Sequence, residues 1–188
     1  MAAPASMDGR LLLVEGESDA VALRTLAEVA GGDLAGTGIV VAGGAHATPP
    51  ILLAHGPRGS GRLVGGLIDR AEVPFLIVAL RRAGFPCIPP ETAPARAGFG
   101  ICDRDLEDEL LRALGEDAAL DLIAREGEAS ALATLRSQSA WADRPLHDQL
   151  RRFLASRAGR KRRYAGLMVR AIPAGRHPAP LRHALGLV

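Results

Sequence analysis

Residues 11–20 read LLLVEGESDA, and this stretch predicts the first unit of the fold. Four consecutive apolar residues at 11–14 fit a parallel strand that is covered on both faces. Gly16 ends the strand, and Ser18 and Asp19 offer side-chain oxygens that cap a helix. Apolar residues then recur at helical spacing. The stretch therefore predicts a strand, a tight turn and a helix.

Apolar segments elsewhere predict further strands. They lie at residues 39–42, 63–68 and 98–102, and residues 85–88 are a short strand candidate. A helix is predicted over about residues 72–82. Strands that alternate with helices imply an α/β domain with a parallel sheet and crossover helices.

From residue 105 onward the chain is predicted to be helical. The predicted helices span residues 105–114, 116–125, 130–136, 146–155 and 160–172, followed by a short piece framed by Pro178 and Pro180. We therefore expect an α/β core over residues 9–115 and a helical C-terminal part with a basic segment over residues 116–188.

The composition excludes several classes of protein. Aromatic residues make up only 3% of the chain, which argues against nucleic-acid binding through stacked aromatic platforms. No apolar run approaches the roughly 18 residues of a membrane helix, and no secretory signal is evident. Cys87 and Cys102 are too few for a disulfide scaffold and are expected to be buried. A cytoplasmic protein without a membrane partner is predicted.

Carboxylates follow three of the predicted strands. The candidates are Glu15, Asp19, Asp69, Glu72, Asp105 and Glu107. Because functional groups collect at the carboxyl ends of parallel strands, we expect these side chains to converge on one edge of the sheet. Taken singly, each acid is better explained as a cap or dipole partner of a helix N-terminus than as a ligand, and only the convergence of three segments favours a metal site.

A cluster of this kind requires neutralisation. Two carboxylates about 4 Å apart repel by about 4 kcal/mol at an effective dielectric near 20. Mg²⁺ or Mn²⁺ is the expected occupant, since hard cations take oxygen ligands and the sequence offers no Cys or His set that would prefer zinc.

Residues 12–20 closely resemble the opening motif of TOPRIM domains, in which a hydrophobic strand delivers a glutamate and a glycine turn starts a helix. Residues 66–69 and 105–110 resemble the TOPRIM domain of the OLD (overcoming lysogenisation defect) family of nucleases. Together with residues 41–44, the resemblance covers roughly residues 9–172. It implies a Rossmann-like TOPRIM fold, with a central parallel sheet flanked by helices and a helical C-terminal extension.

The resemblance also implies a Mg²⁺- or Mn²⁺-dependent endonuclease that hydrolyses DNA with two cations. Glu15 and Asp19 would hold one cation, Asp69 would be shared, and Asp105 and Glu107 would complete the pair, with Glu15 and Asp69 central to catalysis. The TOPRIM pattern has Asp-x-Asp after its third strand, whereas residues 69–72 read DRAE. Glu72 is therefore the candidate substitute for the second aspartate. Residues 103–105 match Asp-x-Asp literally but follow a later strand.

The C-terminal segment is strongly basic. Residues 149–188 contain ten Lys and Arg side chains and no Asp or Glu, whereas the preceding part of the chain has an acidic excess. Such polarity fits a protein that binds metal at one place and a polyanion at another. Arg157, Arg160, Arg162 and Arg163 are predicted to bind backbone phosphates. A solvated, arginine-rich helix face explains the charge equally well.

Lys161 is the only lysine in the chain. A compact ammonium is not interchangeable with a guanidinium fork. OLD-like nucleases carry a lysine in their helical C-terminal part, so the resemblance implies that Lys161 is catalytic and stabilises charge on the phosphate. An ordinary surface lysine is the alternative.

The glycine-rich loop at residues 56–61 does not match a loop that binds nucleoside triphosphates. Arg62 and Leu63 stand where a Walker A loop needs Lys and then Ser or Thr. OLD proteins normally join an ATPase domain to the TOPRIM domain, so the resemblance implies a solitary form, with an ATPase partner acting in trans or none. Two other functions stay open: a non-catalytic TOPRIM module that binds nucleic acid or an ATPase, and a nucleotidyl transferase.

Overall fold

The computed structural model describes residues 9–32, 34–44, 47–87, 89–157 and 159–187, and it confirms the α/β fold. Its parallel sheet has the order β2-β1-β3-β4. The strands are β1 (Arg10–Val14), β2 (Thr37–Val41), β3 (Val64–Asp69) and β4 (Phe99–Cys102).

The strand candidate at residues 85–88 is wrong for its described part, because residues 85–87 form no strand. Ile88 lies outside the described residues. Pro86 lacks the backbone N–H that a ladder needs, and Phe85 instead packs against the core beneath α3 (Val73–Ala83).

The continuous apolar run of β1 is buried on both faces, as its composition predicts. Leu12 and Val14 belong to one hydrophobic cluster, whereas Leu11 and Leu13 belong to another on the opposite face of the sheet. Successive side chains of a strand point to opposite faces, so only an uninterrupted apolar run can serve two helical layers.

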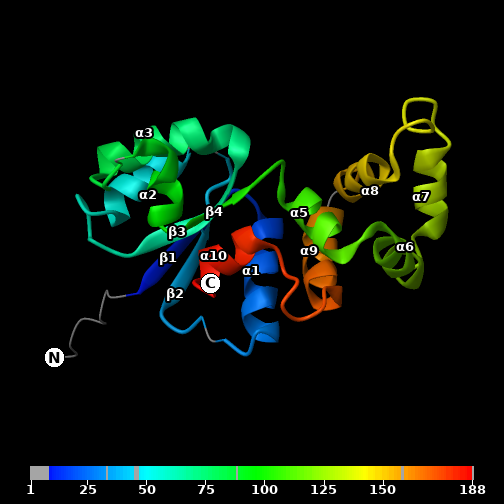
Figure 1. Cartoon of the computed structure of the whole chain (residues 1–188), viewed down its shortest axis with the longest axis horizontal. Helices are drawn as coiled ribbons and strands as arrows, with labels where there is room; N and C mark the ends of the chain where they lie inside the picture. The colour runs from blue at the N-terminus through cyan, green and yellow to red at the C-terminus, as the bar shows by residue number, and fades with distance from the viewer. Residues whose placement is uncertain (1–8, 33, 45–46, 88, 158, 188) are drawn as a thin grey trace.

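Helices cover both faces of the sheet (Figure 1). On one face lie α1 (Glu17–Val29) and α10 (Ala179–Leu185). On the other lie α2 (Thr48–His55), α3 and α4 (Ala93–Arg96), with the short 3-10 turns η2 (Arg70–Glu72) and η3 (Pro90–Thr92) beside them.

The remaining helices lie beyond the carboxyl ends of the strands (Figure 1). They are α5 (Leu106–Leu114), α6 (Glu116–Arg125), α7 (Ala129–Arg136), α8 (Leu146–Ala155) and α9 (Arg160–Ala171). One cluster of buried side chains runs from β1 and α1 through all five of them. Among the described helices, none combines the length and the apolar character needed to cross a bilayer.

Two glycines permit the close packing that places the site. A Cβ on Gly66 would lie 1.8 Å from the carbonyl oxygen of Leu13, and its φ of +153° disfavours other residues. A Cβ on Gly100 would lie 2.0 Å from the carbonyl oxygen of Pro180. Glycine therefore lets β3 pair closely with β1, and lets the C-terminal segment return onto β4.

Candidate active site

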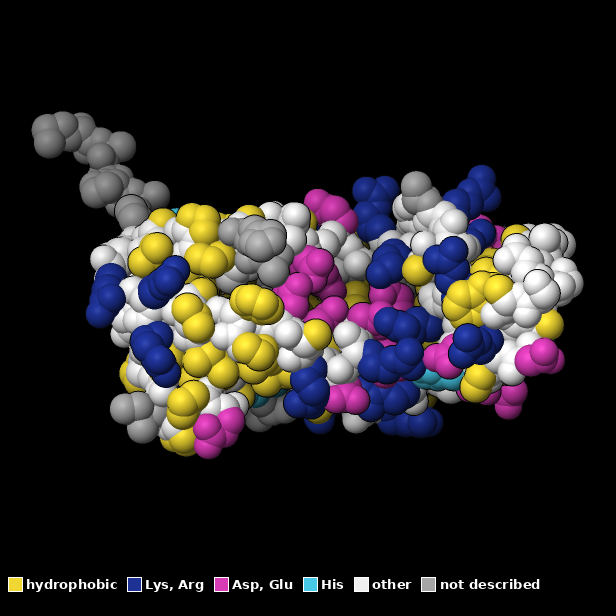
Figure 2. Space-filling view, turned by 90° about the horizontal axis from the view of Figure 1, so that it is seen from above, with side chains coloured by type: hydrophobic (Ala, Val, Ile, Leu, Met, Phe, Trp, Pro, Cys, Tyr) yellow, Lys and Arg dark blue, Asp and Glu magenta, His cyan; other side chains and the backbone are white. Residues whose placement is uncertain are grey.

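A cleft of about 570 Å³ lies where β1 and β3 end. The predicted carboxylates that line it are Glu15, Asp19, Asp69, Asp105 and Glu107. Lys161 and Arg162 of α9 line the same cleft. Figure 2 shows acidic side chains gathered in a central hollow, with a band of basic side chains beside it. We call this space the acidic cleft.

Local geometry fixes the acids at the end of β1. Glu15 follows the last residue of β1, and Gly16 in extended conformation begins the turn into α1. Asp19 lies in the first turn of α1, where its Oδ2 accepts a hydrogen bond of 2.9 Å from the Gly16 backbone N–H. The cap of the helix thus directs this carboxylate toward the cleft.

Asp69 is the last residue of β3, paired in register with Cys102 of β4. Cys102 is 1% exposed and Cys87 is 6% exposed, so both cysteines are buried as predicted. Burial beside Asp69 raises the pKa of the Cys102 thiol far above its usual range. The Cys102 thiol beside Asp69 therefore stays uncharged at neutral pH.

The two carboxylates of the α5 segment are held by cations from later helices. Asp105 caps α5 by accepting a hydrogen bond of 2.9 Å at Oδ1 from the Asp108 backbone N–H. Its Oδ2 accepts a hydrogen bond of 2.7 Å from Arg151 Nε of α8. Glu107, which is 4% exposed, accepts a hydrogen bond of 2.9 Å at Oε2 from Lys161 Nζ. Both negative charges are therefore partly neutralised by the protein.

The pKa values of Asp19 and Asp69 are raised. Burial raises the pKa of Asp19 to about 6, and Glu107 and Glu15 add repulsion. Burial, together with repulsion from Asp105, Asp19 and Glu15, raises the pKa of Asp69 to about 7. At neutral pH, charge at the sheet edge is therefore costly in the absence of an added cation.

The ion-paired groups shift the other way. Burial alone would raise the pKa of Asp105, but the hydrogen bonds from Arg151 and the Asp108 N–H outweigh it and lower that pKa. Burial would likewise lower the pKa of Lys161, yet the hydrogen bond and charge of Glu107 raise it. Asp105 stays ionised and Lys161 stays protonated across the physiological range.

The donor set suits a hard cation, but it is not a closed ligand sphere. Every carboxylate in the acidic cleft offers oxygen, and among the described residues no His or Cys side chain lines the cleft, which fits Mg²⁺ or Mn²⁺. Within the part of the chain that the structure describes, no three Asp, Glu, His or Cys side chains stand close enough to hold a metal ion as they are.

Glu72 lies outside the acidic cleft. It ends the 3-10 turn η2 and lines an adjoining small hollow with Glu15, Gly44 and Thr48. Its charge still contributes to the raised pKa of Asp69. The turn after β3 carries the chain away from the cleft, and for this reason Glu72 does not lie beside Asp69.

Asp103 also faces away from the cleft. Its Oδ1 accepts a hydrogen bond of 2.6 Å from Arg70 Nε, and its backbone N–H donates to Glu109 Oε1 at 2.9 Å. Of the literal Asp-x-Asp at residues 103–105, only Asp105 lines the cleft.

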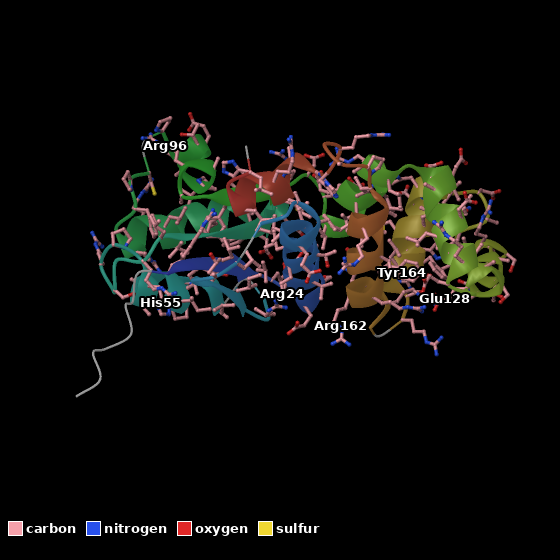
Figure 3. The ribbon with its side chains drawn as sticks, turned by 90° about the horizontal axis from the view of Figure 1, so that it is seen from below. Arg24, His55, Arg96, Glu128, Arg162 and Tyr164 are labelled. Carbon is pink, nitrogen blue, oxygen red and sulfur yellow. The ribbon has the colours of Figure 1, made fainter. Side chains whose placement is uncertain are left out.

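The predicted phosphate-binding arginines have different surroundings. Arg162 lines the acidic cleft and projects from α9 into solvent (Figure 3). Arg157 is exposed but lines neither the acidic cleft nor its neighbours. Arg163 forms ion pairs with Glu126 and Glu128.

Arg160 is a structural residue, contrary to the phosphate-binding interpretation of the sequence. Its side chain is 6% exposed, and its Nε lies 2.8 Å from Glu128 Oε2. It also donates to Phe153 O at 3.0 Å and to Ser156 Oγ at 2.6 Å, with its guanidinium 3.9 Å from the Phe153 ring centroid. Glu128 is further contacted by Tyr164 (Figure 3). Arg160 therefore ties α9 to α8 and α7.

Sequence reasoning missed Arg151 as a partner of the site. It was visible only as one of many basic residues, and 46 positions separate it from Asp105. No local pattern pairs two residues at that distance. The contact depends on how α8 packs against the start of α5.

Comparison with known proteins places the fold. No protein-family model matches the chain, and no curated protein matches it. The C-terminal region of the Xanthomonas campestris pv. campestris OLD protein has a TM-score of 0.71 at 21% identity, over 95% of this chain and 91% of that chain. The C-terminal region of the Burkholderia pseudomallei OLD protein has a TM-score of 0.66 at 21% identity, over 94% and 95%. The chain therefore has the TOPRIM-like fold of OLD C-terminal regions.

Proposed function

We propose that this chain, with the fold of the C-terminal regions of OLD proteins, is a divalent-cation-dependent nuclease that hydrolyses phosphodiester bonds of DNA. The carrying observation is the acidic cleft itself. Carboxylates from the ends of β1 and β3 and from the start of α1 and α5 line it together with the only lysine of the chain.

The carboxylates of the acidic cleft would hold the cations. Glu15 and Asp19 would bind one, Asp105 and Glu107 would bind a second, and Asp69 would be shared between them. When bound, Mg²⁺ or Mn²⁺ would supply an activated water and stabilise the leaving oxygen of an in-line displacement.

The protein's own groups prepare this chemistry. With a pKa of about 7, Asp69 loses its proton only near neutral pH, so the cleft becomes a stronger cation site as the pH rises. Lys161 stays protonated at the same cleft, where an ammonium can stabilise charge that builds on a phosphate. Arg162 adds a second positive group for the phosphate backbone.

A non-catalytic module is the second candidate, and one observation favours it. Arg151 and Lys161 already neutralise Asp105 and Glu107, and the described residues include no ready set of three ligands. In such a module the two basic side chains would take the place of a second cation. The cleft would then bind nucleic acid or a partner ATPase without cleaving it.

Plasmid nicking in Mn²⁺ tests the nuclease. The purified chain should nick supercoiled DNA, and Glu15→Gln or Asp69→Asn should abolish nicking. Asp103→Asn is the matched control, since this acid follows a neighbouring strand but pairs with Arg70 outside the cleft. Nicking by the two cleft variants at the wild-type rate would show that the acidic cleft is not the active site.

Calorimetric titration with Mn²⁺ distinguishes the nuclease from the non-catalytic module, because the module would bind no cation at millimolar concentration.

A further inference from the structure

A second cleft of about 460 Å³ adjoins the acidic cleft. The two share Asp105, Glu107 and Lys161, so they form one continuous depression. The basic side chains that line only the second cleft are Arg104, Arg144, Arg151 and Arg152. We call this space the arginine cleft.

Two of these arginines have no acidic partner in the described part of the chain. Arg104 lies 3.1 Å from Asp148, and Arg151 is bound to Asp105. For Arg144 and Arg152, by contrast, no ion pair forms with any described carboxylate, and both are exposed. The arginine cleft therefore presents uncompensated positive charge directly beside the acidic one.

The only tryptophan of the chain lines the arginine cleft. Trp141 is partly buried, with its inner side packed against the large hydrophobic core. The Arg152 guanidinium lies 5.8 Å from its ring centroid, within the range of a cation–π interaction. An indole ring and two guanidinium groups without a described carboxylate partner thus line one depression.

A buried glutamine holds this loop in place. Gln149 is 3% exposed, and its Nε2 donates to the carbonyl oxygens of Trp141 at 2.8 Å and Arg144 at 3.0 Å. These bonds fix the backbone on either side of the loop to α8. The residues are therefore ordered before any ligand arrives, which reduces the entropy lost on binding.

We infer that the arginine cleft binds a single-stranded segment of nucleic acid and leads it to the acidic cleft, an inference that rests on the proposed function. Arg144 and Arg152 would contact consecutive backbone phosphates. An unpaired base would stack on Trp141, which a base inside a duplex cannot do. The low aromatic content still excludes an extended stacking platform, but a single ring suffices for one base.

Intrinsic fluorescence provides a direct test, because Trp141 is the sole tryptophan. An oligothymidylate of about 12 nucleotides, a typical site size, is added to the wild-type chain in EDTA. We expect the tryptophan emission to be quenched. An abasic oligomer of the same length and charge should bind with little quenching. Equal quenching by the abasic oligomer, or none by either, would overturn the stacking assignment.

Charge variants test the phosphate contacts. Arg144→Ala/Arg152→Ala should weaken oligothymidylate binding in a fluorescence anisotropy assay. The slope of log K against log salt should become shallower by about 1.4, at roughly 0.7 for each single-strand phosphate contact. Arg81→Ala/Arg82→Ala, which removes equal charge from the exposed end of α3, is the control. Equal effects of the two double variants would overturn the inference.

Variants of the ring complete the test. Trp141→Ala should weaken binding by about fivefold or more, whereas Trp141→Phe keeps a stacking face and guards against a folding defect. Binding of Trp141→Ala at wild-type strength would contradict the assignment. Because binding is measured in EDTA, its failure counts against the arginine cleft alone, whereas failure of Mn²⁺-dependent nicking counts against the nuclease alone.

Discussion

Lys161 Nζ donates a hydrogen bond of 2.9 Å to Glu107 Oε2, although 54 positions separate the two residues in the chain. The contact joins α9 to α5 across the acidic cleft. It links the side chain that we expect to contact phosphate with one that we expect to bind a cation. A cation bound to Glu107 would weaken the hydrogen bond between Glu107 and Lys161. Cation binding would therefore free the Lys161 ammonium to contact a phosphate.

Removing the ammonium should separate stability from activity. Lys161→Met leaves a buried carboxylate without its partner, so we expect the free energy of unfolding to fall by about 1 kcal/mol, discounted because Lys161 is half exposed. Lys161→Arg should keep that stability but lower plasmid nicking at least tenfold, since a guanidinium fork does not replace a compact ammonium. Urea denaturation and nicking rates measure both effects; full nicking by Lys161→Arg would contradict the catalytic assignment.

Stability should fall as the pH rises from about 4 to about 7. The pKa values of Asp19, about 6, and Asp69, about 7, lie above the ordinary aspartate value of 3.8. In this window the folded chain binds more protons than the unfolded chain, and the free energy of unfolding therefore decreases with pH. Urea denaturation at several pH values should give a shallower dependence for Asp69→Asn, with Asp103→Asn retaining the wild-type slope. Identical slopes for the wild type and both variants would show that burial and repulsion do not raise the pKa of Asp69.

Divalent cations should restore the stability lost at high pH. At pH 8 Asp19 and Asp69 are ionised, so Mn²⁺ should raise the melting temperature, whereas at pH 5 protons compete for these two carboxyls and the rise should be smaller. A concentration 100 times the dissociation constant stabilises the folded state by about 2.7 kcal/mol. Thermal denaturation measures the shift, and Glu15→Gln should reduce it. A rise that is independent of pH would place the cation elsewhere.

Two neighbouring arginines should behave oppositely on truncation. Arg160→Ala removes the buried partner of Glu128, and breaking a buried ion pair typically costs about 3 kcal/mol or more. Arg157→Ala removes an exposed side chain and should change the free energy of unfolding by less than about 0.5 kcal/mol. Chemical denaturation of both variants is the measurement, and similar small effects would show that the contacts of Arg160 contribute little.

Much of the fold could be predicted because its signals are local. The apolar run of β1 and the glycine that follows it predict the strand and turn without any tertiary contact. Helix α8 matches the predicted bounds because its apolar and polar residues alternate with helical period. No helix was predicted where α2 lies; Pro49 and Pro50 fall in its first turn, where proline is tolerated.

The amino-acid sequence alone determined which carboxylates end the strands, because strand ends are marked by local changes of residue type. Tertiary structure decided which of them share a cleft, for Glu72 turns away while Asp105 and Glu107 meet side chains of α8 and α9. It also decided that Arg160 is buried and Arg152 exposed, within one basic segment. The charge of a residue is set by its type, but its partner depends on helices that pack together from distant parts of the chain.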